Sequence, residues 1–364
     1  MKRYFVRTAA ALLAAVLLYP GQAWAISAQK AILTDAQTGR VLYEKDADSR
    51  SLIASTTKIM TALVVCEQCN VLDRVKIPRE AVGIEGSSMY LREGEVLTVQ
   101  ELLYGLMLRS GNDAAVALAI YCGGTVEGFA GLMNDKAHFL GLTRTHFENP
   151  NGLDSPNHYS TARDLSVLAA YAMKNPIFAQ TVSTKTVTIG ERSLRNHNKL
   201  LWQFEGADGV KTGFTKAAGR ILVSSAVRDG RRLVAVTIND GNDWADHTQM
   251  LNDGFSRYRV QRIITAGDCL GRVAVMGGQK ASVSVVAAED FSYALSTDEQ
   301  PYVLLSGPGF DYAPVAEGQD AGAAYICIGD AVVGKVAVKY SETVEQFVPE
   351  KKHFWDNWFG GKKK

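Results

Sequence analysis

A serine and a lysine three residues apart, Ser55 and Lys58, have the types and spacing that acyl transfer requires. A serine hydroxyl is a weak nucleophile at neutral pH unless an adjacent base accepts its proton. Positions i and i+3 are neighbours on a helix, so the Lys58 amine can reach the Ser55 hydroxyl if this segment opens a helix. The backbone N–H of Ser55 would then be free to stabilise an oxyanion. The pair predicts a serine nucleophile with a lysine base.

A second motif, Ser110-Gly111-Asn112, is predicted in a turn between two helices. The Ser110 hydroxyl can relay a proton to a leaving group. The Asn112 side chain can bond a substrate amide. Both residues are therefore candidate site residues.

The third motif, Lys211-Thr212-Gly213, occurs once and lies on a predicted strand. Lys211 and Thr212 offer a charge and a hydroxyl to a substrate carboxylate. Gly213 lets a substrate backbone approach the strand edge. Lys58 must be neutral to accept a proton, and burial together with the nearby cation Lys211 would lower its pKa towards that state.

Taken singly, the first two motifs are weak signals, because the chain contains a decoy of each. Ser27 and Lys30 share the spacing of the first motif, and Ser155 and Asn157 share that of the second. Ser27 opens no predicted helix, and Ser155 lies in a loop rich in Pro and Asn. One ordered set alone combines a helix start, a turn between helices and a strand, which makes a chance match improbable.

The elements that must position these motifs predict an α+β fold with an antiparallel sheet. A strand hairpin comes first, a block of helices follows, and a strand meander with a final helix closes the domain. The hairpin is expected at 31–35 and 40–44. An amphipathic helix follows Ser55, with Ile59, Met60, Leu63 and Val64 on its apolar face. Further helices are expected at 98–108, which begins with a capping box of Thr98 and Glu101, at 113–121, at 126–140, and at 161–174, which stops at Asn175-Pro176. Strands are expected at 209–215, 221–228 and 231–239, with a tight turn at Asp229-Gly230, and the last helix at 244–258.

Residues 262–345 differ from the preceding part of the chain in their sequence pattern. Short runs of alternating apolar residues are separated there by turns with Gly, Pro and Asp. They predict a small all-β domain, and no cluster in it could do chemistry. The tail, 349–364, places four large aromatic side chains on one helical arc between lysines. Such a segment suits an interfacial helix on an anionic membrane. The alternatives are a helix packed on the protein's own surface and a disordered end.

The composition excludes several classes of protein. A chain of 364 residues with 47% hydrophobic residues is neither disordered nor, without long apolar runs, a multi-span membrane protein. Residues 1–25 combine a basic start, a 12-residue apolar run and Ala23-Trp24-Ala25, which predicts a signal peptide and an exported protein. Without the two basic ends, 31 basic residues face 36 acidic ones. That balance argues against a nucleic-acid partner.

The five cysteines do not predict a metal site. Cys66-x-x-Cys69 has no second Cys pair or His cluster to complete it. Both cysteines fall on one helix face and are expected as core residues, with a disulfide from Cys66 or Cys69 to Cys122 as the alternative.

The three motifs together resemble those of low-molecular-mass penicillin-binding proteins of the serine-type D-alanyl-D-alanine carboxypeptidase family. The resemblance covers about residues 26–258 and implies a domain like that of β-lactamases and transpeptidases. It includes the stretches 149–154, 159–165, 198–202 and 208–215. Some relatives carry His where this chain has Asn151 and Phe214, which could alter rate or substrate preference.

The resemblance also implies roles for named residues. Ser55 would be the acyl-enzyme nucleophile, Lys58 its proton acceptor and Ser110 the third catalytic residue. Lys211 would bind substrate, and the backbone N–H groups of Ser55 and Phe214 would form the oxyanion hole. No metal or organic cofactor is implied.

The implied substrates are D-Ala-D-Ala stem peptides of peptidoglycan, with β-lactams as inhibitors. A β-lactamase would need an added base for deacylation, and Glu148 is the local candidate, although a solvated loop charge is the simpler interpretation. A penicillin-binding sensor or scaffold without turnover is the other alternative.

Overall fold

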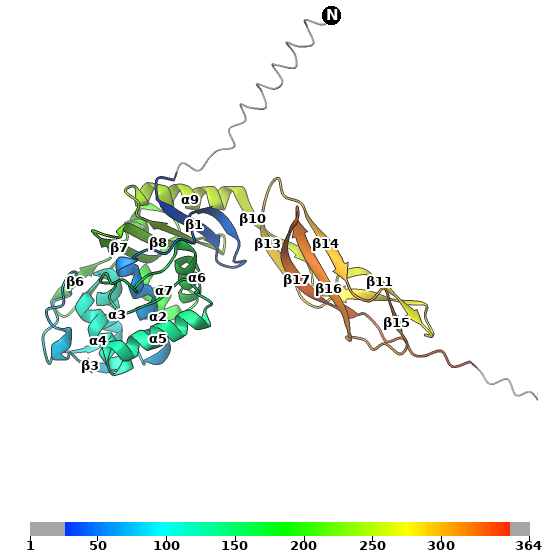
Figure 1. The fold of residues 1–364 in the computed structure, drawn as a ribbon, viewed down its shortest axis with the longest axis horizontal. Helices are drawn as coiled ribbons and strands as arrows, with labels where there is room; N and C mark the ends of the chain where they lie inside the picture. The colour runs from blue at the N-terminus through cyan, green and yellow to red at the C-terminus, as the bar shows by residue number, and fades with distance from the viewer. Residues whose placement is uncertain (1–25, 350–364) are drawn as a thin grey trace, which may run out of the picture. The chain divides into compact units, whose positions relative to one another are not determined.

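The computed structural model describes residues 26–349, which form two compact units (Figure 1). One unit extends to Ser256, and the other begins at Arg257. The predicted signal peptide, and all of the predicted tail after Pro349, lie outside the described residues.

The first unit is built on a five-stranded antiparallel sheet, with strand order β2-β1-β9-β8-β7. Its strands are β1 (Lys30–Asp35), β2 (Val41–Lys45), β7 (Ala207–Thr215), β8 (Gly219–Arg228) and β9 (Arg231–Ile238). The predicted hairpin and meander are therefore confirmed. β7, which carries the third motif, is an edge strand.

The two faces of this sheet are covered by different helices because side chains alternate along each strand. Val234 and Val236 join the core shared with the helical block. Leu233 lies on the other face, where a Cβ added at Gly254 would approach it to 2.7 Å. Gly254 belongs to α9 (Asp243–Arg257), which Figure 1 shows along the opposite side of the sheet. The fold is thus α+β, as predicted.

The helical block holds the first two motifs. Its helices are α2 (Lys58–Gln68), α3 (Val99–Leu108), α4 (Asn112–Gly123), α5 (Val126–Phe139), α6 (Ala162–Ala172), α7 (Pro176–Ser183) and α8 (Leu200–Gln203). Two 3₁₀ turns, η1 (Ala54–Thr57) and η2 (Arg79–Ala81), belong to the same block. Two short strand pairs complete it: β3 (Arg74–Lys76) pairs with β4 (Val96–Thr98), and β5 (Thr186–Ile189) pairs with β6 (Arg192–Arg195). The predicted capping box of Thr98 and Glu101 is present at the start of α3. The turn predicted around Ser110 separates α3 from α4.

Two expectations need correction. Ser55 does not open an α-helix, because it lies in the 3₁₀ turn that precedes α2. The helix is also not amphipathic, since every residue from Lys58 to Val65 is buried. Helices α3 to α7 all contact α2, so its polar side chains lie in the interior as well.

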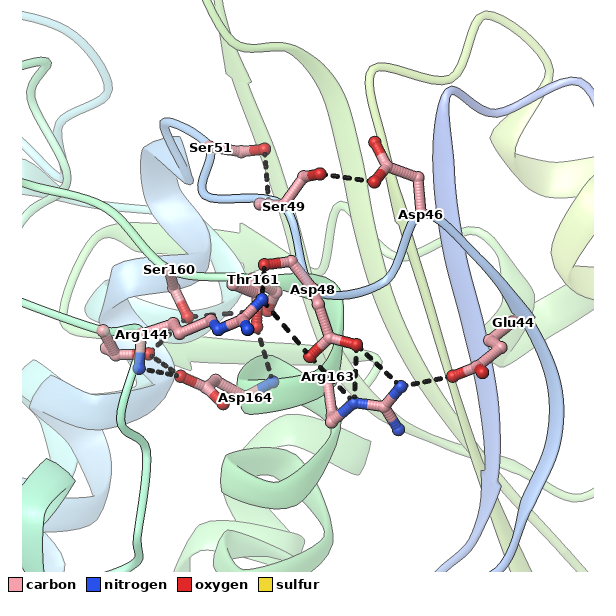
Figure 2. A network of polar contacts seen from close by, with 11 residues as sticks. Glu44, Asp46, Asp48, Ser49, Ser51, Arg144, Ser160, Thr161, Arg163 and Asp164 are labelled. Carbon is pink, nitrogen blue, oxygen red and sulfur yellow. Dashed lines mark hydrogen bonds and ion pairs between the residues drawn. The ribbon is translucent and has the colours of Figure 1, made fainter.

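A polar network ties α6 to the segment that leads from β2 to the Ser55 turn (Figure 2). Arg163 donates to the two carboxylate oxygens of Asp48 at 3.0 and 2.9 Å and also pairs with Glu44. The backbones of Ser51 and Ser160 exchange two hydrogen bonds at 2.8 and 3.1 Å. This network fixes the chain four residues before Ser55.

We expect Arg163→Leu to lower the free energy of unfolding by about 1–2 kcal/mol, because it leaves a partly exposed carboxylate pair without its bidentate partner. Thermal unfolding of the purified chain measures this. Arg79→Leu is the matched control, since Arg79 and Glu93 form an exposed pair at 3.7 Å. Equal melting temperatures for the two variants would contradict a positioning role for the network.

The second unit is all-β, as predicted. A six-stranded sheet has the order β14-β16-β17-β12-β11-β15, and β10 pairs with β13. The strands are β10 (Tyr258–Ile264), β11 (Cys269–Met276), β12 (Ser282–Ala287), β13 (Phe291–Ser296), β14 (Pro301–Ser306), β15 (Phe310–Tyr312), β16 (Asp320–Ile328) and β17 (Ala331–Tyr340). Alternate residues such as Val336, Val338 and Tyr340 fill its core.

Candidate active site

The Ser55 turn is held between a loop and the edge strand. Ala54 has φ +44°, a left-handed conformation that is unfavourable for a residue with a Cβ. Two glycines allow the close packing around this turn. A Cβ at Gly152 would lie 1.9 Å from the Ala54 carbonyl oxygen, and one at Gly213 would lie 3.3 Å from the Ser55 nitrogen. The first and third motifs therefore meet, as the sequence predicts.

Lys58 is fully buried, and its amine contacts three oxygens. The Nζ atom lies 3.0 Å from Ser55 Oγ, 2.7 Å from Asn112 Oδ1 and 2.5 Å from the Asn151 carbonyl oxygen. The Asn112 and Asn151 oxygens can only accept. A neutral amine would give them its two N–H groups and would keep its lone pair for the Ser55 hydroxyl proton. This geometry suits a base.

The surroundings of Lys58 and Lys211 favour the neutral form of the Lys58 amine. Burial lowers the pKa of Lys58 well below its usual 10.5, the Lys211 charge lowers it further, and Asp113 partly opposes the shift. Burial also lowers the pKa of Lys211 to about 7. A lysine that is neutral in the folded protein can take a proton from a hydroxyl, so the predicted pKa argument agrees with the structure.

The second motif reaches the site from the junction of α3 and α4. Ser110 has φ +61° and is buried, and Asn112 is the first residue of α4. The Asn112 side chain donates to the Glu85 carbonyl oxygen at 2.5 Å while it accepts from Lys58. A Cβ at Gly86 would lie 2.7 Å from the Asn112 amide nitrogen, so a glycine is needed there. Asn112 thus orients Lys58, a contact that the sequence did not indicate.

A cleft of about 500 Å³ opens over these groups. Five of the predicted site residues line it, namely Ser55, Ser110, Thr212, Gly213 and Phe214. The other three, Lys58, Asn112 and Lys211, are buried beside it. The structure therefore brings all eight predicted residues together.

Two further contributors were not predicted. The Asn151 carbonyl oxygen bonds Lys58, and a backbone oxygen has no signature in a sequence. His158 is buried, and its Nε2 atom lies 2.7 Å from the hydroxyl of Thr57. Because the Glu148 N–H donates to His158 Nδ1, the Nε2 atom carries the proton and donates to Thr57. The sequence offers one signal for His158, its place directly before the stretch 159–165.

Glu148, the candidate added base, does not line the cleft. Its carboxylate accepts from the Ser155 hydroxyl and from Asn157 Nδ2 at 3.2 Å. The hydrogen bond from Ser155 is the main cause that lowers the pKa of Glu148. Its position fits a loop charge.

The cysteines of the described chain are free thiols. Cys69 and Cys122 share a hydrogen bond, while Cys66 packs against the core. Within residues 26–349, no group of three or more His, Cys, Asp or Glu side chains could hold a metal ion. Over the same residues, no single helix is long and apolar enough to cross a membrane, and only α4 and α5 together reach that length and composition, bent by 82°.

The serine turn, the buried lysine beside it and the cleft along an antiparallel edge strand define a protein of the acyl-serine, penicillin-binding class. Comparisons with known proteins specify the family. Residues 19–242 match the family model described as D-alanyl-D-alanine carboxypeptidase, and residues 258–346 match that of the C-terminal domain of penicillin-binding protein 5. The chain therefore belongs to the D-alanyl-D-alanine carboxypeptidase family of low-molecular-mass penicillin-binding proteins.

Individual relatives agree with this assignment. The chain is 33% identical to D-alanyl-D-alanine carboxypeptidase DacF of Bacillus subtilis over 81% of this chain and 80% of the relative. It is 32% identical to DacC of Escherichia coli over 93% and 92%. The crystal structure of penicillin-binding protein 5 from Haemophilus influenzae superposes with a TM-score of 0.78 at 30% identity, over 90% of this chain and all of that one. The protein is thus a serine-type carboxypeptidase with a cell-wall function that binds β-lactams.

The burial of Lys211 predicts a stability gain when its charge is removed. The unfolded chain keeps the Lys211 proton up to pH ~10.4, whereas the folded protein loses it near pH 7. The unfolded state thus binds more protons between these values, and stability rises with pH there. We expect Lys211→Met to raise Tm by several degrees at pH 7 and to weaken peptide turnover.

Thermal unfolding between pH 7 and 10 checks this expectation, because the Tm advantage of Lys211→Met should shrink as the pH rises. Lys76→Met is the control, since Lys76 is an exposed lysine on β3. A constant Tm difference across that range would show that the charge of Lys211 is not what destabilises the fold.

Proposed function

We propose that the enzyme releases the terminal D-Ala of peptidoglycan stem peptides by a two-step acyl transfer at Ser55. The observation that carries this proposal is the amine of Lys58, 3.0 Å from Ser55 Oγ, with two obligate acceptors, Asn112 Oδ1 and the Asn151 carbonyl oxygen, for its own protons. That arrangement supports a neutral lysine as general base.

In the first step, Ser55 Oγ attacks the carbonyl carbon of the penultimate D-Ala, and its proton moves to Lys58. The backbone N–H groups of Ser55 and Phe214 stabilise the oxyanion. The amide C–N bond then breaks, Ser110 relays the proton from Lys58 to the departing amine, and free D-Ala leaves. In the second step, water hydrolyses the acyl ester, and Ser55 regains its hydroxyl. No metal or organic cofactor enters this scheme.

The substrate is held along the edge of β7. Lys211 and Thr212 bind its terminal carboxylate, and the absence of a side chain at Gly213 leaves room for its backbone. Asn112 uses its remaining N–H to bond the substrate amide. Phe214 follows Gly213 on β7, lines the cleft and has 65% of its surface exposed.

The site of action is outside the cytoplasm. The basic, apolar and A-x-A pattern of residues 1–25 supports export, and the aromatic and basic pattern of residues 349–364 supports attachment to a membrane surface. The match of residues 258–346 to a penicillin-binding protein C-terminal domain is consistent with an enzyme that works at the cell wall.

Intact mass of the mature protein incubated with benzylpenicillin tests this proposal. We expect a persistent single adduct on Ser55, together with release of D-Ala from a pentapeptide substrate. Rapid loss of the adduct with hydrolysed drug would instead indicate a β-lactamase and would implicate Glu148. A stable adduct without any D-Ala release would indicate a sensor.

A further inference from the structure

Three cysteines gather at the end of α2 that is opposite to Lys58, and the proposed reaction does not use them. Cys66 is in the last turn of α2, Cys69 directly follows this helix, and Cys122 is in the last turn of α4. All three side chains are partly buried against the core of the first unit. We call Cys66, Cys69 and Cys122 the thiol cluster.

The two helices that carry the thiol cluster both begin at the catalytic site. α2 begins at Lys58 and α4 at Asn112, and the side chains of these two residues are bonded at 2.7 Å. α2 has 11 residues and α4 has 12, and the two helices contact each other. The rise per residue is the same in both helices, so two neighbours of nearly equal length that begin together also end together. This arrangement brings Cys69 to Cys122.

Two contacts hold these helix ends together. The Cys69 and Cys122 thiols share a hydrogen bond. The hydroxyl of Tyr121, the neighbour of Cys122, donates to Asp73 Oδ2 at 2.9 Å, and Asp73 lies in the loop that follows Cys69. The Cys69 N–H donates to the Val65 carbonyl oxygen at 3.0 Å, so its backbone stays attached to α2. Thiols in such contact can be joined by small side-chain rotations, whereas cysteines on distant elements cannot.

The three thiols differ in acidity. The hydrogen bond that Cys69 donates lowers the pKa of the Cys122 thiol, although burial opposes this shift. The same hydrogen bond raises the pKa of Cys69, and burial adds to that rise. Burial also raises the pKa of the Cys66 thiol to about 12, with a contribution from Glu67. Because the thiolate is the reactive form of cysteine, Cys122 is the member of the thiol cluster that reacts first with an oxidant.

We propose that Cys69 and Cys122 form a disulfide in the exported protein, which joins the C-terminal ends of α2 and α4, while Cys66 remains a thiol. The structure shows the reduced pair. Disulfides form and persist outside the cytoplasm, and the pattern of residues 1–25 supports export to such a compartment. The inference therefore rests on the proposed export and not on the proposed acyl transfer.

The bond forms by exchange with an external disulfide, for example oxidised glutathione. Cys122 Sγ attacks one sulfur of the oxidant, which gives a mixed disulfide and releases one glutathione. Cys69 then loses its proton, and its Sγ attacks Cys122 Sγ and displaces the second glutathione. Its hydrogen bond to a Cys122 thiolate, the main cause of its raised pKa, no longer exists in the mixed disulfide. In total, two electrons and two protons pass from the protein to the oxidant, which becomes two thiols.

The disulfide stabilises the first unit because it closes the loop from position 69 to position 122 and so restricts the unfolded chain. We expect the oxidised protein to melt at least about 5 °C above the reduced protein. The rate of acylation by benzylpenicillin should agree within twofold between the two forms, since the bond lies at the ends of α2 and α4 opposite to Lys58 and Asn112.

The test uses the full mature protein, equilibrated either with a mixture of oxidised and reduced glutathione or with a phosphine reductant. The remaining thiols are alkylated in denaturant, and the peptides are mapped by mass spectrometry without reduction. We expect one cross-linked peptide pair that contains Cys69 and Cys122, with Cys66, Cys269 and Cys327 alkylated. Thermal unfolding of the same two samples gives the difference in Tm.

Two variants make the test specific. Cys66→Ser is the matched control from the same cluster, and it should keep both the cross-link and the Tm difference. Cys122→Ser should lose both. A cross-link that includes Cys66, the absence of any cross-link, or equal Tm values for the two wild-type samples would overturn the inference. The wild-type comparison decides even if Cys122→Ser does not fold, and no step measures D-Ala release, so failure of the proposed function would leave the result unchanged.

Discussion

Ser55→Ala is expected to abolish covalent labelling by benzylpenicillin and to reduce D-Ala release by roughly 10⁴-fold or more, because no other hydroxyl occupies its position beside Lys58. The mutation removes one oxygen from the wall of the cleft and should leave the fold intact. Intact mass spectrometry measures the adduct, and a coupled D-Ala assay measures turnover.

Ser27→Ala provides a matched control within the same chain. Ser27 and Lys30 have the spacing of Ser55 and Lys58, but the Ser27 hydroxyl bonds to Asp240 and Asp246 at 3.1 and 2.9 Å. Benzylpenicillin should label the Ser27→Ala variant to the same extent as the wild type. An adduct that persists in Ser55→Ala would place the nucleophile elsewhere and refute the site.

Lys58→Met is expected to slow acylation by about 10²–10⁴-fold, the usual contribution of a general base. Methionine is uncharged and of similar length, so the buried helix α2 should remain folded. The loss is therefore chemical: the Ser55 hydroxyl no longer has an acceptor for its proton. Stopped-flow acylation with a chromogenic β-lactam measures the rate.

The pH dependence of the acylation rate distinguishes a chemical role of Lys58 from a structural one. In the wild type, acylation should rise with pH as Lys58 loses its proton, on a limb that lies well below pH 10.5 because burial and Lys211 lower its pKa. That limb should vanish in Lys58→Met. If the limb remains, another group is the base.

The sequence predicted most of the site because its motifs fall at marked element boundaries. The capping box of Thr98 and Glu101 starts the helix that ends just before Ser110. The Asp229-Gly230 turn fixes β8 against β9, and its two residues have φ +51° and +75°. These local signals were enough to order the helical block and the meander, and hence to bring the three motifs into one domain.

Other features were missed because tertiary contacts decide them. The apolar pattern of α2 predicts one buried face, yet helices α3 to α7 all contact it and every residue from Lys58 to Val65 is buried. The Asn175-Pro176 pair predicts a stop for α6, but Asn175 also caps α7 by accepting from the N–H groups of Ile177 and Phe178. Asparagine followed by proline is a known helix start, so that signal was available.

The contacts of Lys58 have a consequence for how the protein can be studied as it folds. This side chain contacts Asn112, 54 positions away, and Asn151, 93 positions away. The turn that precedes it packs against Gly213 on β7. Such distant pairings form late, after the slow closure of long loops. A fluorescent penicillin added during refolding would therefore label only molecules whose helices and sheet have already packed together. The rate of labelling would then report the final step of folding.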